Sequence, residues 1–285
     1  MLMTVTVNGV PVHHAQYGSG DGTPVLALHG AGVDHREIMG GLEPVFAERP
    51  GYRRSYPDLP GMGRTPAPEA LGSNDDVLDL LLGFVDAIIA DEAFLVAGQS
   101  YGGYLARAIA NRRPGQVAGL ALVCAVGAGG AQDERPEHVV LHAAGGLDPE
   151  RDLGPELAAA FRDYLVVQTP ATLRRFQQTV APGAALVDRA ALERLFQRWD
   201  LRTEPEQGPA YANPALILAG RQDAVAGYAG VWRLLQLYPR ATFAVLDRAG
   251  HALLHEQPGL ATALLADWLD RVREHQEARA AASDQ

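Results

Sequence analysis

Short apolar runs recur along the chain, and most of them are followed by a longer segment in which apolar residues repeat with helical spacing. Short apolar runs bounded by turn residues are typical of buried strands. Alternating residues on both sides of Asn8-Gly9 predict a β-hairpin at the start of the chain. We therefore expect strands at residues 4–7, 10–15, 24–28, 53–56, 94–97, 120–126, 215–219 and 242–246.

The segments between these runs have the periodicity of helices. Between residues 75 and 90, apolar side chains at 77, 78, 81, 82, 85 and 88 define one helical face, and Asn74 is a candidate N-cap. Similar patterns predict helices at 101–111, 227–238 and 258–274, followed by a frayed tail from Glu277 onward. Because strands and helices alternate, the sequence predicts an α/β fold with a mostly parallel central sheet and helices on both faces.

Residues 132 to 209 differ from the rest because they contain no strand-like run. Helical patterns at 138–144, 155–167, 171–179 and 188–199 are separated by prolines, and a flexible exit at residues 127–130 precedes them. We therefore divide the chain into an α/β core of residues 1–128 and 211–285 and an inserted helical cap of residues 129–210. Since the insertion falls between two late strands, it can fold over the carboxyl edge of the sheet as a lid.

Composition and charge narrow the class of protein. The 285 residues are 47 % hydrophobic, which is sufficient for a large core without metals or disulfides. The formal charge is −10 and no basic cluster is present, so we expect neither nucleic acid nor a membrane as a partner. The single cysteine, Cys124, lies in an apolar run and is expected to be a buried structural thiol. No signal peptide and no apolar run of about 18 residues is found, which predicts a cytoplasmic protein.

The strongest chemical signal is a glycine-flanked serine. Residues 98–102, Gly-Gln-Ser-Tyr-Gly, fit G-x-S-x-G and lie between a predicted strand and a predicted helix. A sharp strand-to-helix turn holds its serine in a strained backbone geometry with the hydroxyl exposed. Gly98 and Gly102 keep side chains out of this turn. We therefore predict that Ser100 is a nucleophile.

A nucleophilic serine needs a base within hydrogen-bond reach and a carboxylate that orients the base. His251 follows the strand that ends at residue 246, and Asp223 follows the strand that ends at residue 219. We expect both at the same edge of the sheet as Ser100, in the roles of base and acid. Asp133 also follows a strand and is a weaker candidate for the acid, whereas the setting of Asp58 indicates a role in loop architecture.

Attack on a carbonyl produces an oxyanion, which two backbone N–H groups should meet. The N–H of Tyr101 opens the helix after the serine, and the N–H of Ala31 lies in a Gly-rich turn after the strand at 24–28. We expect these two groups to form the oxyanion hole. His29 is expected to brace the Gly-rich turn, and His35 is expected to lie on the surface.

Taken together, these motifs resemble an α/β-hydrolase-fold enzyme with a helical cap. The resemblance covers nearly the whole chain except the cap, and it implies a catalytic triad in the chain order Ser100, Asp223, His251. A serine at this position argues against the haloalkane dehalogenase and epoxide hydrolase branches, whose nucleophile is an aspartate. The motifs are His29-Gly-Ala-Gly32, Asp58-Leu-Pro-Gly-Met-Gly-Arg64, Gly98-Gln-Ser-Tyr-Gly102, Asp223 and Gly250-His251.

The resemblance leaves three functions open. The first is hydrolysis of small or medium esters or lactones through an acyl-enzyme on Ser100. The second is carbon–carbon bond hydrolysis of vinylogous diketone acids (aromatic meta-cleavage products), although many such enzymes have an aromatic residue directly after the histidine, where this chain has Ala252. The third is a non-catalytic protein that keeps the fold to bind a ligand.

The cap is expected to decide among substrates. Its aromatic residues would supply an apolar pocket, although their helical spacing is more typical of a cap core: Phe161, Tyr164, Phe176, Phe196 and Trp199. An anionic diketone acid would need one of its arginines in the pocket, namely Arg162, Arg174, Arg175 or Arg194.

No metal or cofactor is expected. The sequence lacks H-E-x-x-H, paired cysteines and a dinucleotide fingerprint. The expected partner is a small-molecule substrate, and the chain is expected to be a monomer or a homodimer.

Overall fold

Eight strands form the main sheet of the computed structural model, which describes residues 1–18, 20–127 and 134–283. These strands are β1 (Leu2–Val7), β2 (Val10–Tyr17), β3 (Thr23–Leu28), β4 (Tyr52–Pro57), β5 (Phe94–Gln99), β6 (Val117–Val123), β9 (Ala215–Gly220) and β10 (Ala241–Leu246). They lie side by side in the order β1-β2-β4-β3-β5-β6-β9-β10. All pairs from β4 to β10 are parallel, whereas β1 and β2 pair antiparallel with each other and β2 pairs antiparallel with β4. The predicted mostly parallel sheet is confirmed.

The predicted N-terminal hairpin is also confirmed. Val7 pairs with Val10, and the two residues between them, Asn8 and Gly9, have φ of 49° and 81°. A two-residue turn between antiparallel strands requires positive φ at both central positions, which Asn-Gly adopts at little cost. The hairpin therefore covers one edge of the parallel sheet.

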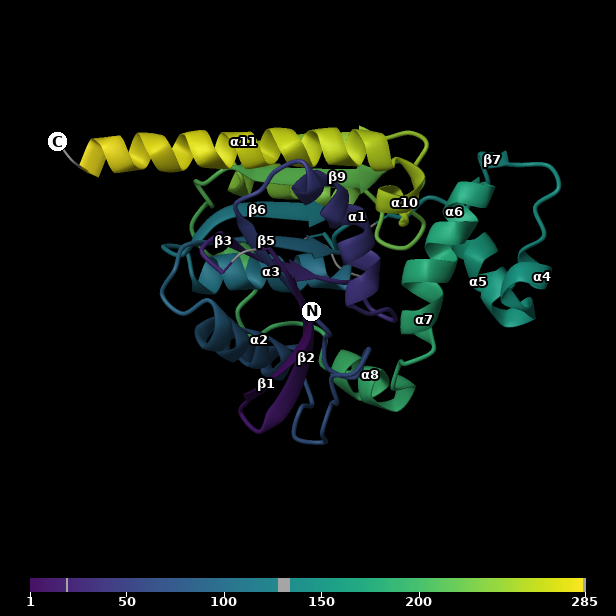
Figure 1. The fold of residues 1–285 in the computed structure, drawn as a ribbon, viewed down its shortest axis with the longest axis horizontal. Helices are drawn as coiled ribbons and strands as arrows, with labels where there is room; N and C mark the ends of the chain where they lie inside the picture. Colours follow the sequence, from purple (N-terminus) through teal and green to yellow (C-terminus); the bar gives the residue numbers. More distant parts are fainter. Residues whose placement is uncertain (19, 128–133, 284–285) are drawn as a thin grey trace.

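Helices cover both faces of the sheet, as predicted. The core helices are α1 (His35–Ala47), α2 (Asn74–Ile88), α3 (Tyr101–Arg112), α9 (Ala229–Arg233), the 3₁₀ helix η4 (Leu234–Leu237), α10 (Leu253–Glu256) and α11 (Pro258–Ser283). Side chains of α1 and α11 belong to one apolar cluster and those of α2 and α3 to the other. In Figure 1, α11 runs above β6, and α3 and α2 lie below β5. Each face has its own apolar cluster, with Trp268 of α11 buried in one and Phe84 of α2 buried in the other. Because the sheet is covered on both faces, central strands such as β6 and β9 are continuously apolar.

Three details of the core differ from the sequence prediction. Helix α1 was not predicted. The N-cap of α2 is Ser73 rather than Asn74, because the Ser73 hydroxyl accepts from the Asp76 N–H at 3.3 Å, while Asn74 is the first helical residue. Helix α11 continues to Ser283, so the predicted frayed tail is helical over its described part.

The chain between β6 and β9 forms short helices and one small two-stranded sheet over its described residues, 134–210, which we call the insertion. Its elements are β7 (His142–Ala143), α4 (Pro149–Leu153), α5 (Pro155–Tyr164), β8 (Val167–Gln168), α6 (Pro170–Arg175), the π-helix η2 (Phe176–Val180), α7 (Ala181–Ala184), α8 (Arg189–Phe196) and the 3₁₀ helix η3 (Pro205–Gln207). The predicted helix at 138–144 is wrong, since β7 lies there and pairs in parallel with β8. The expectation that this stretch contains no strand is therefore wrong as well. The predicted exit at 127–130 and the boundary at 128/129 fall on residues 128–133, outside the described chain.

The insertion packs on the core through its own apolar cluster. Phe161, Leu173, Phe176 and Val180 of the insertion cluster with Ala252, which directly follows His251 in the core. Figure 1 shows α4, α5, α6 and α7 together at one end of the sheet, beside α1 and α10. The insertion thus leaves the core after β6 and returns before β9, and it lies next to the loop that carries His251.

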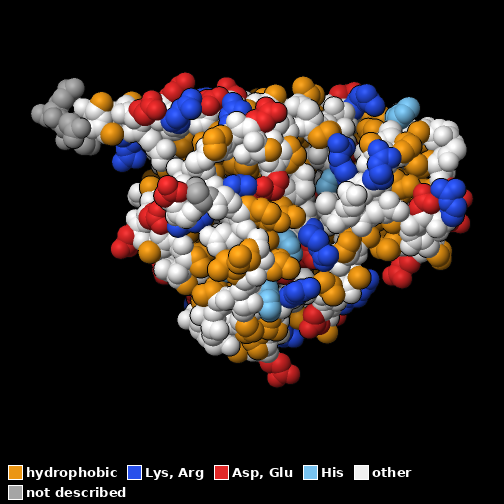
Figure 2. Space-filling model, in the orientation of Figure 1, with side chains coloured by type: hydrophobic (Ala, Val, Ile, Leu, Met, Phe, Trp, Pro, Cys, Tyr) orange, Lys and Arg blue, Asp and Glu red, His pale blue; other side chains and the backbone are white. Residues whose placement is uncertain are grey.

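The visible surface mixes acidic and basic side chains. Along α11, at the top of Figure 2, red and blue side chains alternate, and Arg271 and Asp267 form one such pair at 2.9 Å. Among the described helices, none combines the length and the apolar character needed to cross a lipid bilayer.

Candidate active site

Ser100 occupies the sharp turn between β5 and α3, with φ 52° and ψ −118°. Such a backbone conformation costs a residue with a side chain on the order of 1–3 kcal/mol, and it persists only where neighbouring structure enforces it. Here the Ser100 N–H donates to the Val123 carbonyl at 3.0 Å, and its carbonyl accepts from the N–H groups of Gly103 and Val126. These bonds tie the turn to β6 on one side and to α3 on the other. The predicted strained turn is confirmed.

Two glycines allow the backbone to close around Ser100. A Cβ atom on Gly98 would overlap with the carbonyl group of Gly102, and a Cβ atom on Gly102 would overlap with the carbonyl group of Leu28. Because both obstacles are backbone atoms, no side-chain movement can relieve the overlap. The start of α3 therefore packs directly on the ends of β5 and β3.

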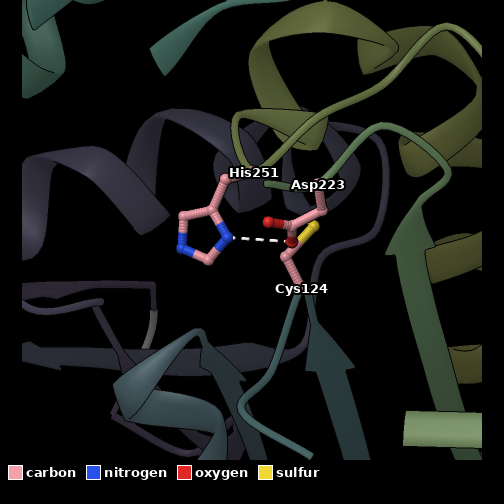
Figure 3. Close-up of side chains that lie close together, drawn as sticks. All are labelled: Cys124, Asp223 and His251. Atoms are coloured by element: carbon pink, nitrogen blue, oxygen red, sulfur yellow. Dashed lines mark hydrogen bonds and ion pairs between the residues drawn. The ribbon is translucent and has the colours of Figure 1, made fainter. Parts of the chain in front are cut away.

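His251 and Asp223 follow two other strands and contact each other. Nδ1 of His251 and Oδ2 of Asp223 are 2.9 Å apart, as the dashed line in Figure 3 marks. The second oxygen of Asp223, Oδ1, accepts from the backbone N–H groups of Val225 and Ala226, both at 2.9 Å. The other ring nitrogen of His251, Nε2, faces away from Asp223 in Figure 3.

This contact sets the protonation of both groups. Burial alone would raise the pKa of the Asp223 carboxyl, but the charge of His251 and the hydrogen bonds from His251, Ala226 and Val225 hold this pKa below its usual range. Burial also opposes a charge on His251, yet the Asp223 carboxylate outweighs burial and raises the pKa of the imidazole. Asp223 is therefore ionised and orients the imidazole with its Nδ1–H toward the carboxylate.

Cys124 lies beside this pair at the end of β6 (Figure 3). The thiol is fully buried, and its Sγ lies 3.5 Å from the carbonyl oxygen of Gly250. Burial, followed by the charge of Asp223, raises the pKa of the thiol well above its usual range. The thiol therefore keeps its proton, which agrees with the predicted structural role and not with a nucleophile.

The Gly-rich turn after β3 lies against Ser100. A Cβ atom on Gly30 would lie 3.2 Å from Cβ and 3.8 Å from Oγ of Ser100, and the next residue, Ala31, lines the same cavity as Ser100. His29 braces this turn, as predicted: the Leu59 N–H donates to its Nε2 at 2.9 Å, so Nδ1 carries the proton that it donates to the Gly30 carbonyl at 2.7 Å. Burial lowers the pKa of His29, and the ring is neutral.

His35 is buried, and the prediction that it lies on the surface is wrong. It is 9 % exposed, and its Nδ1 lies 2.7 Å from Oδ1 of Asp58. Asp58 also accepts from the backbone N–H groups of His35 and Arg64, so it holds its own loop together, as predicted. His35 was misassigned because the sequence did not reveal α1, whose first residue it is. Asp133, the alternative acid, lies outside the described residues.

Ser100 and His251 line one cavity of about 230 Å³. Its wall on the side of the insertion is mostly apolar and comes from Leu157, Ala160, Phe176, Val180 and Ala184. Its polar wall comes from Glu37, Gln99 and Tyr164, in addition to Ser100 and His251. Larger hollows elsewhere on the described chain contain neither Ser100 nor His251.

The aromatic residues of the insertion divide into two groups. Tyr164 and Phe176 line the cavity, and Phe161 packs edge-on against Phe176 without reaching it. Phe196 and Trp199 do not line the cavity. Both pack against the ring of Tyr101.

The arginines of the insertion do not line this cavity in the described structure. Arg162 pairs with Glu150 at 3.1 Å on the surface, Arg175 donates to the carbonyl of His255, and Arg194 donates to backbone carbonyls of the loop at residues 67–71. Arg174 is exposed. An anionic substrate would therefore find no arginine from the insertion in this cavity.

Three buried polar residues near the cavity were given no role by the sequence. Glu37 is the third residue of α1, Gln99 directly precedes Ser100, and Glu256 ends α10. Glu256 accepts from the N–H groups of Gly250, at 2.6 Å, and Val166, at 2.6 Å, so it joins the His251 loop to the insertion. The sequence offered no clear signal for Glu37, because helix α1 was not predicted.

The fold and this site define a class of protein. A mostly parallel sheet covered by helices, with a serine on a strand-to-helix turn near an Asp–His pair, is the arrangement of α/β hydrolases. Residues 25–263 match the model of the alpha/beta hydrolase family, and the chain belongs to this family.

Individual relatives are similar along most of the chain. The chain is 28 % identical over 263 residues to 2-hydroxymuconate semialdehyde hydrolase from Pseudomonas sp. (strain CF600), covering 89 % of each chain. It is 28 % identical over 259 residues to pimeloyl-(acyl-carrier protein) methyl ester esterase from Aeromonas hydrophila, covering 84 % of this chain and 92 % of the esterase. It matches the crystal structure of an alpha/beta superfamily hydrolase from Oenococcus oeni PSU-1 with a TM-score of 0.86 and 27 % identity, over 95 % of this chain and 99 % of that one. Hydrolysis is the activity that these relatives share.

We predict that Gly102→Ala destabilises the folded protein by about 1–3 kcal/mol or more, because the new Cβ meets the backbone of β3. The matched control is Gly115→Ala, since a Cβ atom there has no neighbouring atom within 4 Å. Urea unfolding of both variants measures the difference in the free energy of unfolding. Equal free energies of unfolding for Gly102→Ala and Gly115→Ala would contradict the close approach of Gly102 to the Leu28 carbonyl.

We also predict that Asp223→Asn lowers the pKa of the His251 imidazole. In the native protein the carboxylate raises this pKa against the opposing effect of burial, so burial dominates once the charge is removed. An NMR titration of the His251 ring protons measures the pKa in both proteins. An unchanged or raised value in the variant would show that the carboxylate does not govern the imidazole.

Proposed function

We propose that the protein is a serine hydrolase that cleaves small esters or lactones through an acyl-enzyme on Ser100. The observation that carries this proposal is the hydrogen bond between His251 and Asp223, with Nε2 of the same imidazole turned away from the carboxylate and His251 lining one cavity with a strained serine. A serine, a base and an orienting acid are the three groups that acyl transfer requires.

In the proposed first step, Ser100 Oγ attacks the substrate carbonyl carbon and transfers its proton to Nε2 of His251. Asp223 stabilises the imidazolium that forms, because it holds the other ring nitrogen and keeps its own negative charge. The oxyanion would be met by the N–H groups of Ala31 and Tyr101. Support for these two donors comes from the position of Ala31 in the cavity wall and from Tyr101 being the first residue of α3, whose N–H has no acceptor within its helix.

In the proposed second step, the imidazolium gives its proton to the leaving alcohol, and the acyl group remains bonded to Ser100. Water then attacks the acyl carbon and gives a proton to His251, which returns it to Ser100 as the acid is released. The base must be neutral to start either attack. Its raised pKa therefore predicts that activity falls as the pH drops through that value.

The cavity limits the size and the polarity of the substrate. Its volume of about 230 Å³ lies below the range of about 300–1,000 Å³ that holds drug-sized ligands. The apolar wall from α5, η2 and α7 suits a short hydrocarbon chain. This wall supports a lid role for the insertion, which we propose as the cap of residues 129–210.

A second candidate is carbon–carbon hydrolysis of a vinylogous diketone acid. It is favoured by the similarity to 2-hydroxymuconate semialdehyde hydrolase. Two observations weigh against it: the cavity is lined by the carboxylate Glu37 and not by an insertion arginine, and Ala252 stands where many such enzymes have an aromatic residue. A non-catalytic ligand-binding role is the third candidate, and the paired Asp223 and His251 make it weaker than either hydrolase.

We predict that a fluorophosphonate probe forms one serine adduct on the native protein and none on Ser100→Ala. Intact-mass measurement detects the adduct, and Gly115→Ala is the control. No adduct on the native protein, or equal labelling of Ser100→Ala, would refute the proposed nucleophile.

We further predict that Asp223→Asn lowers kcat/KM for a short ester on the order of 10⁴-fold, because the imidazole loses its orienting charge.

We predict that the protein hydrolyses short-chain esters faster than a meta-cleavage product, since the latter is an acid entering a cavity that contains Glu37. The yellow absorbance of the dienolate decreases when its carbon–carbon bond is cleaved, and a pH-stat follows the ester. A larger kcat/KM for the dienolate than for every ester tested would favour the second candidate.

A further inference from the structure

The polar wall of the cavity contains a carboxylate and an amide that the proposed ester mechanism does not use. Glu37 is 0 % exposed and Gln99 is 2 % exposed, yet both line the cavity next to Ser100. Tyr164 of α5 lies between them: its hydroxyl is 3.4 Å from the Gln99 side-chain nitrogen and 3.4 Å from Oε1 of Glu37.

The direction of these hydrogen bonds can be assigned from the groups that can only accept. The Gln99 side chain lies 3.5 Å from the carbonyl oxygen of His251, so its amide nitrogen must face that carbonyl. The Glu37 carboxylate can also only accept, so the Tyr164 hydroxyl donates its single proton to Glu37 and accepts from Gln99. The three side chains thus form one chain of donors that ends at Glu37.

With the hydrogen bonds in this direction, the atoms of Glu37 and Gln99 that remain without a partner are both acceptors. Oε1 of Gln99 and Oε2 of Glu37 have no hydrogen-bond partner in the described structure. On its other side, Oε1 of Glu37 lies 3.5 Å from Nε2 of His255. A buried acceptor without a partner is costly, so each of these oxygens calls for a donor, which a water molecule, an ion or a ligand can supply.

We propose that these two oxygens bind a hydrogen-bond donor on the substrate, either a hydroxyl group or a protonated amine, close to the carbonyl that Ser100 attacks. This inference rests on the proposed ester hydrolysis. The acceptors select for a donor, and the charge of Glu37 selects against a carboxylate at the same place. The apolar wall formed by Leu157, Phe176 and Val180 accommodates the rest of a short chain.

The first experiment compares four methyl esters on the native protein: butyrate, 3-hydroxybutyrate, 3-aminobutyrate and the monoester of succinate. Acid release is followed in a pH-stat. We expect kcat/KM for the hydroxy or the amino ester to exceed that for butyrate by at least about tenfold, the effect of one hydrogen bond to a charged group. We expect the succinate monoester to be the slowest. The hydroxy and amino esters distinguish a neutral donor from a cationic one.

The second experiment measures the same preference, as a ratio of kcat/KM values, in Glu37→Leu and Glu37→Gln. The ratio of the preferred ester to butyrate should fall to about one in Glu37→Leu, and it should fall partly in Glu37→Gln, which keeps one acceptor of similar shape. The matched control is Glu48→Gln, which makes the same charge change at the exposed C-terminal cap of α1 and should keep the native ratio. If Glu37→Leu does not fold, the fall of the ratio in Glu37→Gln tests the proposal.

The outcomes separate this inference from the proposed function. If native protein cleaves butyrate through Ser100 but treats the four esters alike, or if Glu37→Leu keeps the native preference, the donor site is refuted and ester hydrolysis stands. If no ester is cleaved, or if Ser100→Ala cleaves them at the native rate, both proposals fall.

Discussion

The direct packing of the Ser100 turn on the end of β3 is the constraint on which the site depends. Because Gly102 has no side chain, the first turn of α3 can approach the Leu28 carbonyl, and this approach places the Gly-rich turn after β3 next to Ser100. The same approach forces Ser100 into a positive φ, which its bonds to β6 and α3 then maintain. The proposed nucleophile and one proposed oxyanion donor are therefore positioned by a single backbone contact.

A second interaction joins the insertion to the core. Glu256 is a buried carboxylate that accepts from Gly250 in the His251 loop and from Val166 and Val167 in the insertion. Burial raises its pKa, and these three N–H groups oppose the rise. The position of the imidazole and the position of the insertion over the cavity are thus linked through one side chain. Movement of the insertion would strain the loop that carries the proposed base.

Much of this arrangement could be predicted from the sequence because it depends on local signals. Apolar runs identified the strands, and the carboxyl ends of parallel strands share one edge, so Ser100, Asp223 and His251 could be expected near each other. The pairing of β7 with β8 could not be predicted, since each strand has two residues and no periodicity. Helix α1 was also missed, and with it the burial of His35 and the presence of Glu37 in the cavity. The direction of the Gln99–Tyr164–Glu37 chain depends on contacts between residues far apart in the sequence, which no local pattern contains.

Differences of substrate within the family can be understood from this division. The turn and the Asp–His pair are built from the core, and in the proposed mechanism they perform the same proton transfers whichever bond is attacked. The cavity beside them takes its polar wall from α1, β5 and α5 and its apolar wall from the insertion. A carboxylate such as Glu37 changes the charge that a substrate meets without altering the turn, because it reaches the cavity from a different helix. Under the proposed function, selectivity therefore follows from the side chains that line the cavity, and the proposed nucleophile alone does not determine it.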